Sequence, residues 1–121
     1  MAETPDRKRV QEFARKLFSH YTSGIVTMMV DIGHRTGLFE AVAKGAGTSQ
    51  QIAERAGLDE RYVREWLSAM ATSGIMQYEP TSRTFLLPPE HAVVLTGTSS
   101  LNLAAGSQAL ARYVLDHPET V

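Results

Sequence analysis

The sequence contains no cysteine, so disulfides, thiolate metal sites and cysteine nucleophiles are excluded together. Long hydrophobic runs are also absent. The longest apolar stretch, Ile25 to Ile32, is interrupted by Thr27 and Asp31 and is far shorter than the ~20 residues of a membrane span. The N-terminal residues have no apolar core of the kind found in signal peptides. We therefore expect a soluble, cytoplasmic protein with no membrane partner.

A basic excess is missing too. The formal net charge is −1 and the isoelectric point is about 6.4, whereas small DNA-binding domains are usually basic. Hydrophobic residues make up 43% and charged residues 21% of the 121 positions, a balance typical of one globular domain. The four histidines are scattered, with no pair at helical spacing that would suit a metal. We expect His34 to be a hydrogen-bonded structural residue, and we assign no catalytic, metal or cofactor-binding residue to this chain.

The segment Thr48 to Thr72 carries the strongest signal that is present. Thr48 and Gln51 have the spacing of a capping box at the start of a first short helix. Gly57 suits the left-handed position after that helix, and Asp59 suits the N-cap of a second helix. Apolar residues recur at helical spacing in both helices, which predicts a helix-turn-helix. These residues are Ile52, Ala53, Ala56, Val63, Trp66, Leu67 and Met70.

Two further helices are predicted ahead of this motif. Residues 7–21 carry one apolar stripe, Thr22 to Gly24 interrupt the pattern, and a second helix is expected from Ile25 to Arg35. The second helix is apolar on more than one side, and 121 residues offer little chain to cover it. We therefore expect a homodimer or domain interface there, with a small-molecule pocket as a further possibility. The candidate lining residues are Phe18, Tyr21, Met28 and Met29.

The chain after the motif predicts a hairpin and two more helices. Strands are expected at Ile75–Glu79 and Thr84–Leu87, followed by helices at Glu90–Leu95 and Leu101–Leu115. A hairpin directly after a helix-turn-helix is a wing. The predicted fold class is therefore mostly α with a small β-hairpin: a winged helix-turn-helix flanked by N- and C-terminal interface helices. We divide the chain into interface helices (1–37), winged helix (38–96) and a C-terminal helix with the start of a linker (97–121).

DNA is the natural ligand of a winged helix, and the candidate contacts are Arg61, Arg64, Ser68 and Arg83. Phosphate attraction supplies most non-specific DNA affinity. Between Asp59 and Ser73, however, three acidic residues outnumber two arginines. This balance favours a packing role for the winged helix over DNA binding.

Three motifs carry a family resemblance: GLFEAVAKG, SQQIAERAGLDERYVREWLSAMATSGIMQY and LLPPEHAVVLTG. Together they resemble the N-terminal region of bacterial S-adenosylmethionine-dependent methyltransferases, a group often described as transcriptional regulators. The region is also similar to the dimerisation domain of plant-type O-methyltransferases. The resemblance implies a domain that performs no chemistry, builds the dimer and helps to close the substrate pocket. It also implies that S-adenosylmethionine is bound only by a methyltransferase domain that would follow, near where this chain ends.

Three hypotheses follow for the function. The leading one is a non-catalytic dimerisation and substrate-lid domain of a methyltransferase. The alternative is a DNA-binding transcriptional regulator of the winged-helix type. The third is an interaction module that binds another protein through the Ile25 to Ile32 helix.

Overall fold

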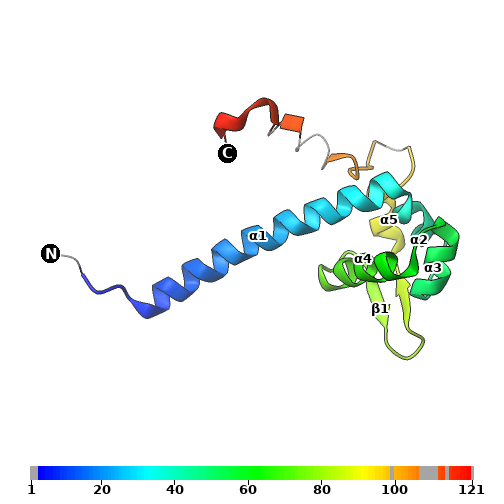
Figure 1. Ribbon diagram of the computed structural model, residues 1–121, viewed down its shortest axis with the longest axis horizontal. Helices are drawn as coiled ribbons and strands as arrows, with labels where there is room; N and C mark the ends of the chain where they lie inside the picture. Colours follow the sequence, from blue (N-terminus) through cyan, green and yellow to red (C-terminus); the bar gives the residue numbers. More distant parts are fainter. Residues whose placement is uncertain (1–2, 99, 107–111, 114, 121) are drawn as a thin grey trace.

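The computed structural model describes residues 3–98, 100–106, 112–113 and 115–120. One long helix extends away from a body built of short helices and a hairpin (Figure 1). In chain order the elements are α1 (Arg7–Thr36), α2 (Leu38–Ala43), α3 (Ser49–Ala56), α4 (Glu60–Thr72), β1 (Gln77–Glu79), β2 (Thr84–Leu86), α5 (Pro89–Leu95) and the 3₁₀ turn η1 (Pro118–Thr120). We call the segment from α2 to α5 the winged-helix body.

The helix-turn-helix forms as the sequence predicts. The Thr48 hydroxyl accepts a hydrogen bond from the Gln51 N–H, and the Gln51 side chain accepts one from the Thr48 N–H at 2.9 Å. Gly57 ends α3 with a φ of 67°, and the Leu58 N–H donates back to the Ala53 carbonyl at 3.0 Å. Asp59 then caps α4 by accepting from the Arg61 N–H. Both helix ends of the motif are therefore fixed by local hydrogen bonds.

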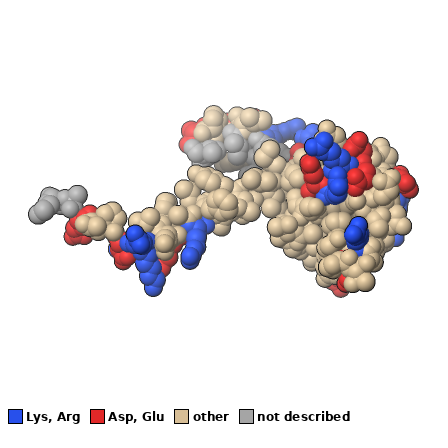
Figure 2. All heavy atoms as spheres, turned by 60° about the horizontal axis from the view of Figure 1, so that its bottom comes forward, with Lys and Arg blue, Asp and Glu red and all other residues tan. Residues whose placement is uncertain are grey.

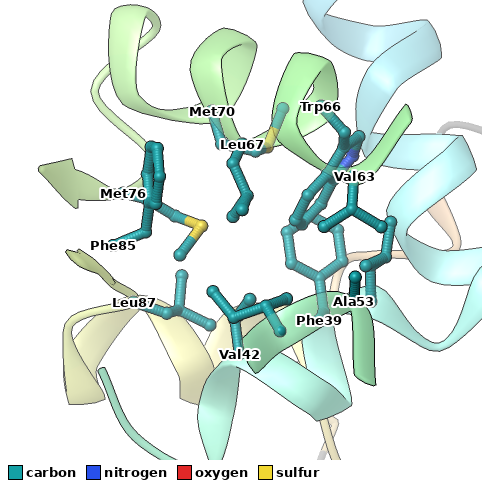
Figure 3. Close-up of a cluster of buried hydrophobic side chains, with 12 residues drawn as sticks. Phe39, Val42, Ala53, Val63, Trp66, Leu67, Met70, Met76, Phe85 and Leu87 are labelled. Atoms are coloured by element: carbon teal, nitrogen blue, oxygen red, sulfur yellow. The ribbon is translucent and has the colours of Figure 1, made fainter. Parts of the chain in front are cut away.

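The core lies where α2, α3 and α4 meet the base of the wing (Figure 3). The two motif helices supply most of it with the apolar positions that the sequence predicted. The hairpin closes one side of this core with Phe85, Leu87 and the residue before β1, Met76. Its members are Leu38, Phe39, Val42, Ile52, Ala53, Val63, Trp66, Leu67, Met70, Met76, Phe85 and Leu87.

The wing is a two-stranded antiparallel hairpin in which Tyr78 pairs with Phe85. Its first strand is shorter than predicted, because the Ile75 and Met76 N–H groups donate to the Met70 carbonyl at the end of α4. Phe85 also exchanges two backbone hydrogen bonds with Gly47, at 3.2 and 2.8 Å. The loop before α3 is therefore bound to the outer side of the wing.

The predicted break at Thr22 to Gly24 is wrong, because α1 is one continuous helix of 30 residues. The Thr22 hydroxyl donates to the Phe18 carbonyl and the Thr27 hydroxyl to the Ser23 carbonyl, at 3.0 and 2.9 Å. Such bonds to the preceding turn let these side chains remain within a helix. Gly24 weakens a helix by only about 1 kcal/mol relative to alanine, which does not end a long one. Despite its length, neither α1 nor any other helix among the described residues is apolar enough to cross a membrane.

The predicted helix from Leu101 to Leu115 is also wrong in its first part. Residues 101–105 form turns and irregular chain, and helical conformation begins at Gly106. Asn102 explains this, since its amide donates to the Gly97 carbonyl and its oxygen accepts from the Ala104 N–H, both at 2.8 Å. The side chain thus replaces the backbone partners of a helix start. Residues 112–113 and 115–116 are helical, while Leu110, Ala111 and Val114 lie outside the described residues.

Trp66 joins α1 to the winged-helix body. Its indole N–H donates to the Met29 carbonyl at 2.9 Å, and its ring meets the Phe39 ring edge-on with 5.1 Å between centroids. Gly33 lies against both rings: a Cβ added there would lie 2.5 Å from the Trp66 ring and 2.7 Å from the Phe39 ring. The absence of a side chain at this position is what lets α1 approach α4 so closely.

Replacement of Gly33 by alanine should therefore destabilise the fold. The new methyl group overlaps two buried rings, and overpacking of this kind costs about 1–3 kcal/mol. Gly24→Ala is the matched control, because it lies in the same helix with nothing within 4 Å of the added Cβ. In urea unfolding the control should be neutral or up to about 1 kcal/mol more stable. Equal effects of the two substitutions would contradict this packing.

Candidate functional site

Helix α1 has two apolar faces that point in different directions. One face carries Met29, Val30 and the buried Gly33, which pack on the winged-helix body. At 100° per residue, a second row of side chains lies on the opposite side of the helix and meets nothing in the body. We call this row the apolar stripe; it consists of Val10, Ala14, Leu17, Tyr21, Ile25, Met28 and Ile32, all exposed.

The stripe is wide as well as long. Phe13 and Phe18 flank it, and the large side chains of this surface are between 37% and 71% exposed. Isolated exposed apolar residues are ordinary, but a contiguous row of large ones marks an interaction site. The first half of α1 has no contact with the winged-helix body in the view of Figure 1, so its apolar residues have no role in the body's own core.

Three of the four residues predicted to line an interface lie on or beside this stripe. Tyr21 and Met28 belong to it, and Phe18 flanks it while also lining a shallow hollow of about 670 Å³ along α1. Met29 differs: it is half-buried against the core, and its carbonyl accepts the Trp66 hydrogen bond. Met29 therefore lies at the edge of the packing face and orients α1, with little surface left for a partner.

A second candidate surface is a groove of about 550 Å³ between α4 and the wing. It is lined by Arg64 and Ser68 from α4 and by Arg83, Tyr78 and Phe85 from the hairpin. The structure thus brings together three of the four residues predicted to contact DNA. Arg61 is not among the lining residues of this groove.

The charges of this second surface are nearly balanced. Arg64 pairs with Glu60 at 3.7 Å and Arg61 pairs with Glu65 at 3.9 Å, both one helical turn apart. Exposed pairs of this type contribute little stability, but each places a carboxylate beside the cation that would meet phosphate. Glu60 also accepts a hydrogen bond from the Ser49 hydroxyl at 2.5 Å, which holds its carboxylate at the groove. In Figure 2 the basic atoms on the body are interleaved with acidic ones, whereas those of α1 gather near its free end.

The tip of the wing is held in a defined conformation. Arg83 has a φ of 55°, unusual for a residue with a side chain, and forms no ion pair with the described residues. Opposite it, the Glu79 carboxylate accepts hydrogen bonds from the backbone N–H and side chain of Thr81, which lower the pKa of Glu79. The tip therefore carries one arginine and one firmly ionised carboxylate, so it adds no net positive charge.

Sequence reasoning missed Arg55, which holds the loop between α2 and α3. Its guanidinium donates to the carbonyls of Gly45 and Ala46 at 2.7 and 3.0 Å, and more weakly to that of Ala41. The loop lies far enough away in sequence that only its glycines hinted at a special backbone. The sequence pattern placed Arg55 on an outer face of α3 and gave no sign of this contact.

No arrangement for catalysis or cofactor binding emerges from the described residues. They contain no group of three metal-binding side chains, and His34 is a half-buried residue of α1 with no side-chain hydrogen bond to them. A methyltransferase domain would bind S-adenosylmethionine in a glycine-rich turn after a strand. The two strands of the described chain form a hairpin, and the residues present do not fit that cofactor.

Comparison with known families decides what this domain is. A family model described as Rv2258c-like winged HTH domain matches residues 24–97, more than half of the chain. The chain belongs to the Rv2258c-like winged-helix family. The matched range includes the C-terminal part of α1 with Gly33, the helix-turn-helix, the wing and α5. The winged helix predicted from the sequence is confirmed, and so is the family resemblance of this region. A search of curated proteins finds no match.

Solved structures of methyltransferases share the fold. PigF, solved with SAH, superposes with a TM-score of 0.71 at 14% identity, over 84% of this chain and 30% of its own. The mitomycin 7-O-methyltransferase MmcR gives 0.67 at 21% identity, over 86% and 31%. The dimethyltransferase RosA from Streptomyces davawensis gives 0.59 at 22% identity, over 70% and 25%. This chain therefore spans less than a third of the length of these three proteins.

Removal of the Arg55 guanidinium should loosen the loop before α3. Arg55→Met keeps most of the side-chain length but leaves the Gly45 and Ala46 carbonyls without their donor. We expect a loss of about 1–2 kcal/mol in urea unfolding, since hydrogen bonds from charged groups exceed neutral ones in strength. Arg61→Met, which removes only an exposed pair at 3.9 Å, should cost less than about 0.5 kcal/mol. A loss at Arg55 no larger than at Arg61 would show that the loop is held by other contacts.

Proposed function

We propose that this domain is the dimerisation and substrate-lid part of an S-adenosylmethionine-dependent methyltransferase. The observation that carries the proposal is the apolar stripe of α1, which faces away from the core of the winged-helix body. A second copy of the same stripe would cover it. The sharing of the fold with PigF, MmcR and RosA supports a methyltransferase context, and the catalytic domain and cofactor site would lie outside these residues.

The substrate-lid part of the proposal concerns residues at the edges of the stripe. Phe18 lines the hollow on α1, and Met28 is an adaptable side chain close to the body. A subunit contact along α1 would place such side chains beside whatever the partner subunit presents. On this proposal Phe18, Tyr21 and Met28 serve the subunit contact first and a small-molecule pocket second. Met29 serves mainly to fix the direction in which α1 leaves the body.

DNA binding is the second candidate function, and one observation favours it. The groove between α4 and the wing brings Arg64, Ser68 and Arg83 to one surface, as a winged-helix DNA reader requires. The two carboxylates paired with Arg61 and Arg64 oppose it, because they lie on the same helix face and repel phosphate. We therefore rank it below the dimerisation role.

The dimer proposal predicts the mass in solution. We expect the chain to sediment as a dimer of its 13.3 kDa protomer. The double variant Ile25→Glu, Met28→Glu should weaken the dimer by at least 100-fold, because burial of each such side chain is worth about 1.5–3 kcal/mol. Both positions are exposed in the protomer, so its circular dichroism should not change.

The control for this test is Tyr62→Glu on α4, since Tyr62 is 70% exposed and Met28 is 67% exposed. It introduces the same charge on a comparably exposed apolar residue outside α1, and the dimer should persist. A wild-type chain that is monomeric at about 100 micromolar, a concentration at which even a weak specific dimer is populated, would refute the dimer proposal. Equal behaviour of the Tyr62→Glu control and the double variant would place the contact elsewhere.

The charge balance predicts no binding to random duplex DNA. In fluorescence anisotropy at low salt, where phosphate contacts are least screened, we expect no saturable signal at about 10 micromolar protein. The regulator alternative predicts binding that weakens steeply with added salt. In that case Arg64→Ala and Arg83→Ala should each reduce the slope of log affinity against log salt by about one. Such a result would place DNA binding above dimerisation as the function of this domain.

A further inference from the structure

The spacing of residues within the apolar stripe has a symmetry that the dimer proposal alone does not require. From Val10 to Ile32 the steps between successive members are four, three, four, four, three and four residues. The pattern is therefore an eleven-residue unit, repeated once, with Tyr21 shared by both units. Eleven residues in three turns give 3.67 per turn, close to the 3.6 of an α-helix. The stripe thus stays on one side of a nearly straight helix over roughly 33 Å, at 1.5 Å per residue.

The same spacing reads identically from either end. Val10 and Ile32 are equally far from Tyr21, as are Leu17 and Ile25. If two copies of α1 pack antiparallel with Tyr21 on the two-fold axis, each member faces a member of the partner's stripe. Val10 then lies opposite Ile32 of the partner subunit, and Leu17 opposite Ile25 of the partner subunit. A two-fold contact needs such a self-complementary patch, and this helix provides one.

Charge along α1 selects the antiparallel direction. Between Arg7 and Lys16 there are five basic side chains and one acidic one, a net charge of +4. Figure 2 shows these basic atoms gathered near the free end of the helix. A parallel pair would hold two such segments side by side and repel, whereas an antiparallel pair separates them to opposite ends. There each basic segment lies beside the partner's C-terminal half of α1, where Asp31 and Arg35 pair with each other.

The position of the winged-helix body leads to the same arrangement. The body packs on α1 only through the face of Met29, Val30 and Gly33, at the C-terminal end of the helix. The N-terminal half of α1 has no support from its own body and would gain it from the partner's C-terminal half. We propose that two chains associate through an antiparallel α1 pair with its two-fold axis at Tyr21. This inference rests on the dimer proposal and adds a direction and a register to it.

Disulfide trapping tests the register, because the natural chain has no cysteine. Helix axes 8–10 Å apart, with Cα atoms 2.3 Å from each axis, bring facing Cα atoms to roughly 3.5–5.5 Å. This range overlaps the Cα separation of a disulfide, about 4.4–6.8 Å. Under mild oxidation, Tyr21→Cys should form a covalent dimer on a non-reducing gel. Val10→Cys and Ile32→Cys alone should not, since each would be roughly 33 Å from its own copy, but the two mixed together should cross-link.

Other outcomes separate failure of the register from failure of the dimer. Self-linking of Val10→Cys, Tyr21→Cys and Ile32→Cys, with no preference for the mixture, indicates a parallel pair and overturns the proposal while the dimer stands. A monomer by sedimentation overturns the dimer itself. If Tyr21→Cys weakens association, the mixture of Ala14→Cys and Met28→Cys provides the same test at another matched pair. Tyr62→Cys, exposed on α4, measures random collision and should remain uncrosslinked.

Discussion

The hydrogen bond from the Trp66 indole to the Met29 carbonyl fixes how the two parts of this molecule meet. It joins α4, the second helix of the helix-turn-helix, to the C-terminal part of α1. Gly33 makes the contact possible, because any side chain there would overlap the Trp66 and Phe39 rings. The direction in which α1 leaves the body follows from this one contact, and so does the choice of which α1 face is covered.

That choice leaves a surplus of apolar surface. The body covers Met29 and Val30, and the opposite row from Val10 to Ile32 remains exposed. A chain of this size has too little material to cover both sides of a 30-residue helix, since small domains bury a smaller share of their surface. The dimer proposal explains the surplus by assigning it to a second copy. The basic residues around the first turns of α1 keep the free end of that surface well hydrated.

The sequence predicted the winged helix well because its signals are local. Thr48 with Gln51, Gly57 and Asp59 each form hydrogen bonds within a few residues, so spacing alone reveals them. The errors arose where distant groups or a flat energetic balance decide. Thr22 and Gly24 look like a break, yet hydroxyl bonds to the preceding turn and a long helix on both sides carry the helix through. Asn102 stops the predicted start of the last helix through bonds that spacing does not show.

The candidate surfaces were predictable to different degrees for the same reason. Phe18, Tyr21 and Met28 follow a helical period, which is enough to place them on one side of α1. Which of the two apolar sides is covered depends on Trp66, 37 residues beyond Met29, and sequence pattern does not reveal this. The groove residues Arg64 and Arg83 come from a helix and a hairpin that the fold brings together. The carboxylates beside the helical arginines are visible in the sequence at i, i+4 spacing, so the argument against DNA was available before the groove was.

The two candidate functions differ in what they require of α1. A DNA reader needs a positive surface on α4 and the wing, and there each helical arginine is paired with a carboxylate one turn away. It leaves the apolar stripe unexplained. A dimerisation domain requires the stripe, needs no net charge on α4, and uses the helix-turn-helix as the block on which α1 is mounted. The rigid contact at Gly33 then matters for function, because a partner bound along α1 would be held at a fixed angle to the body only if that contact is rigid.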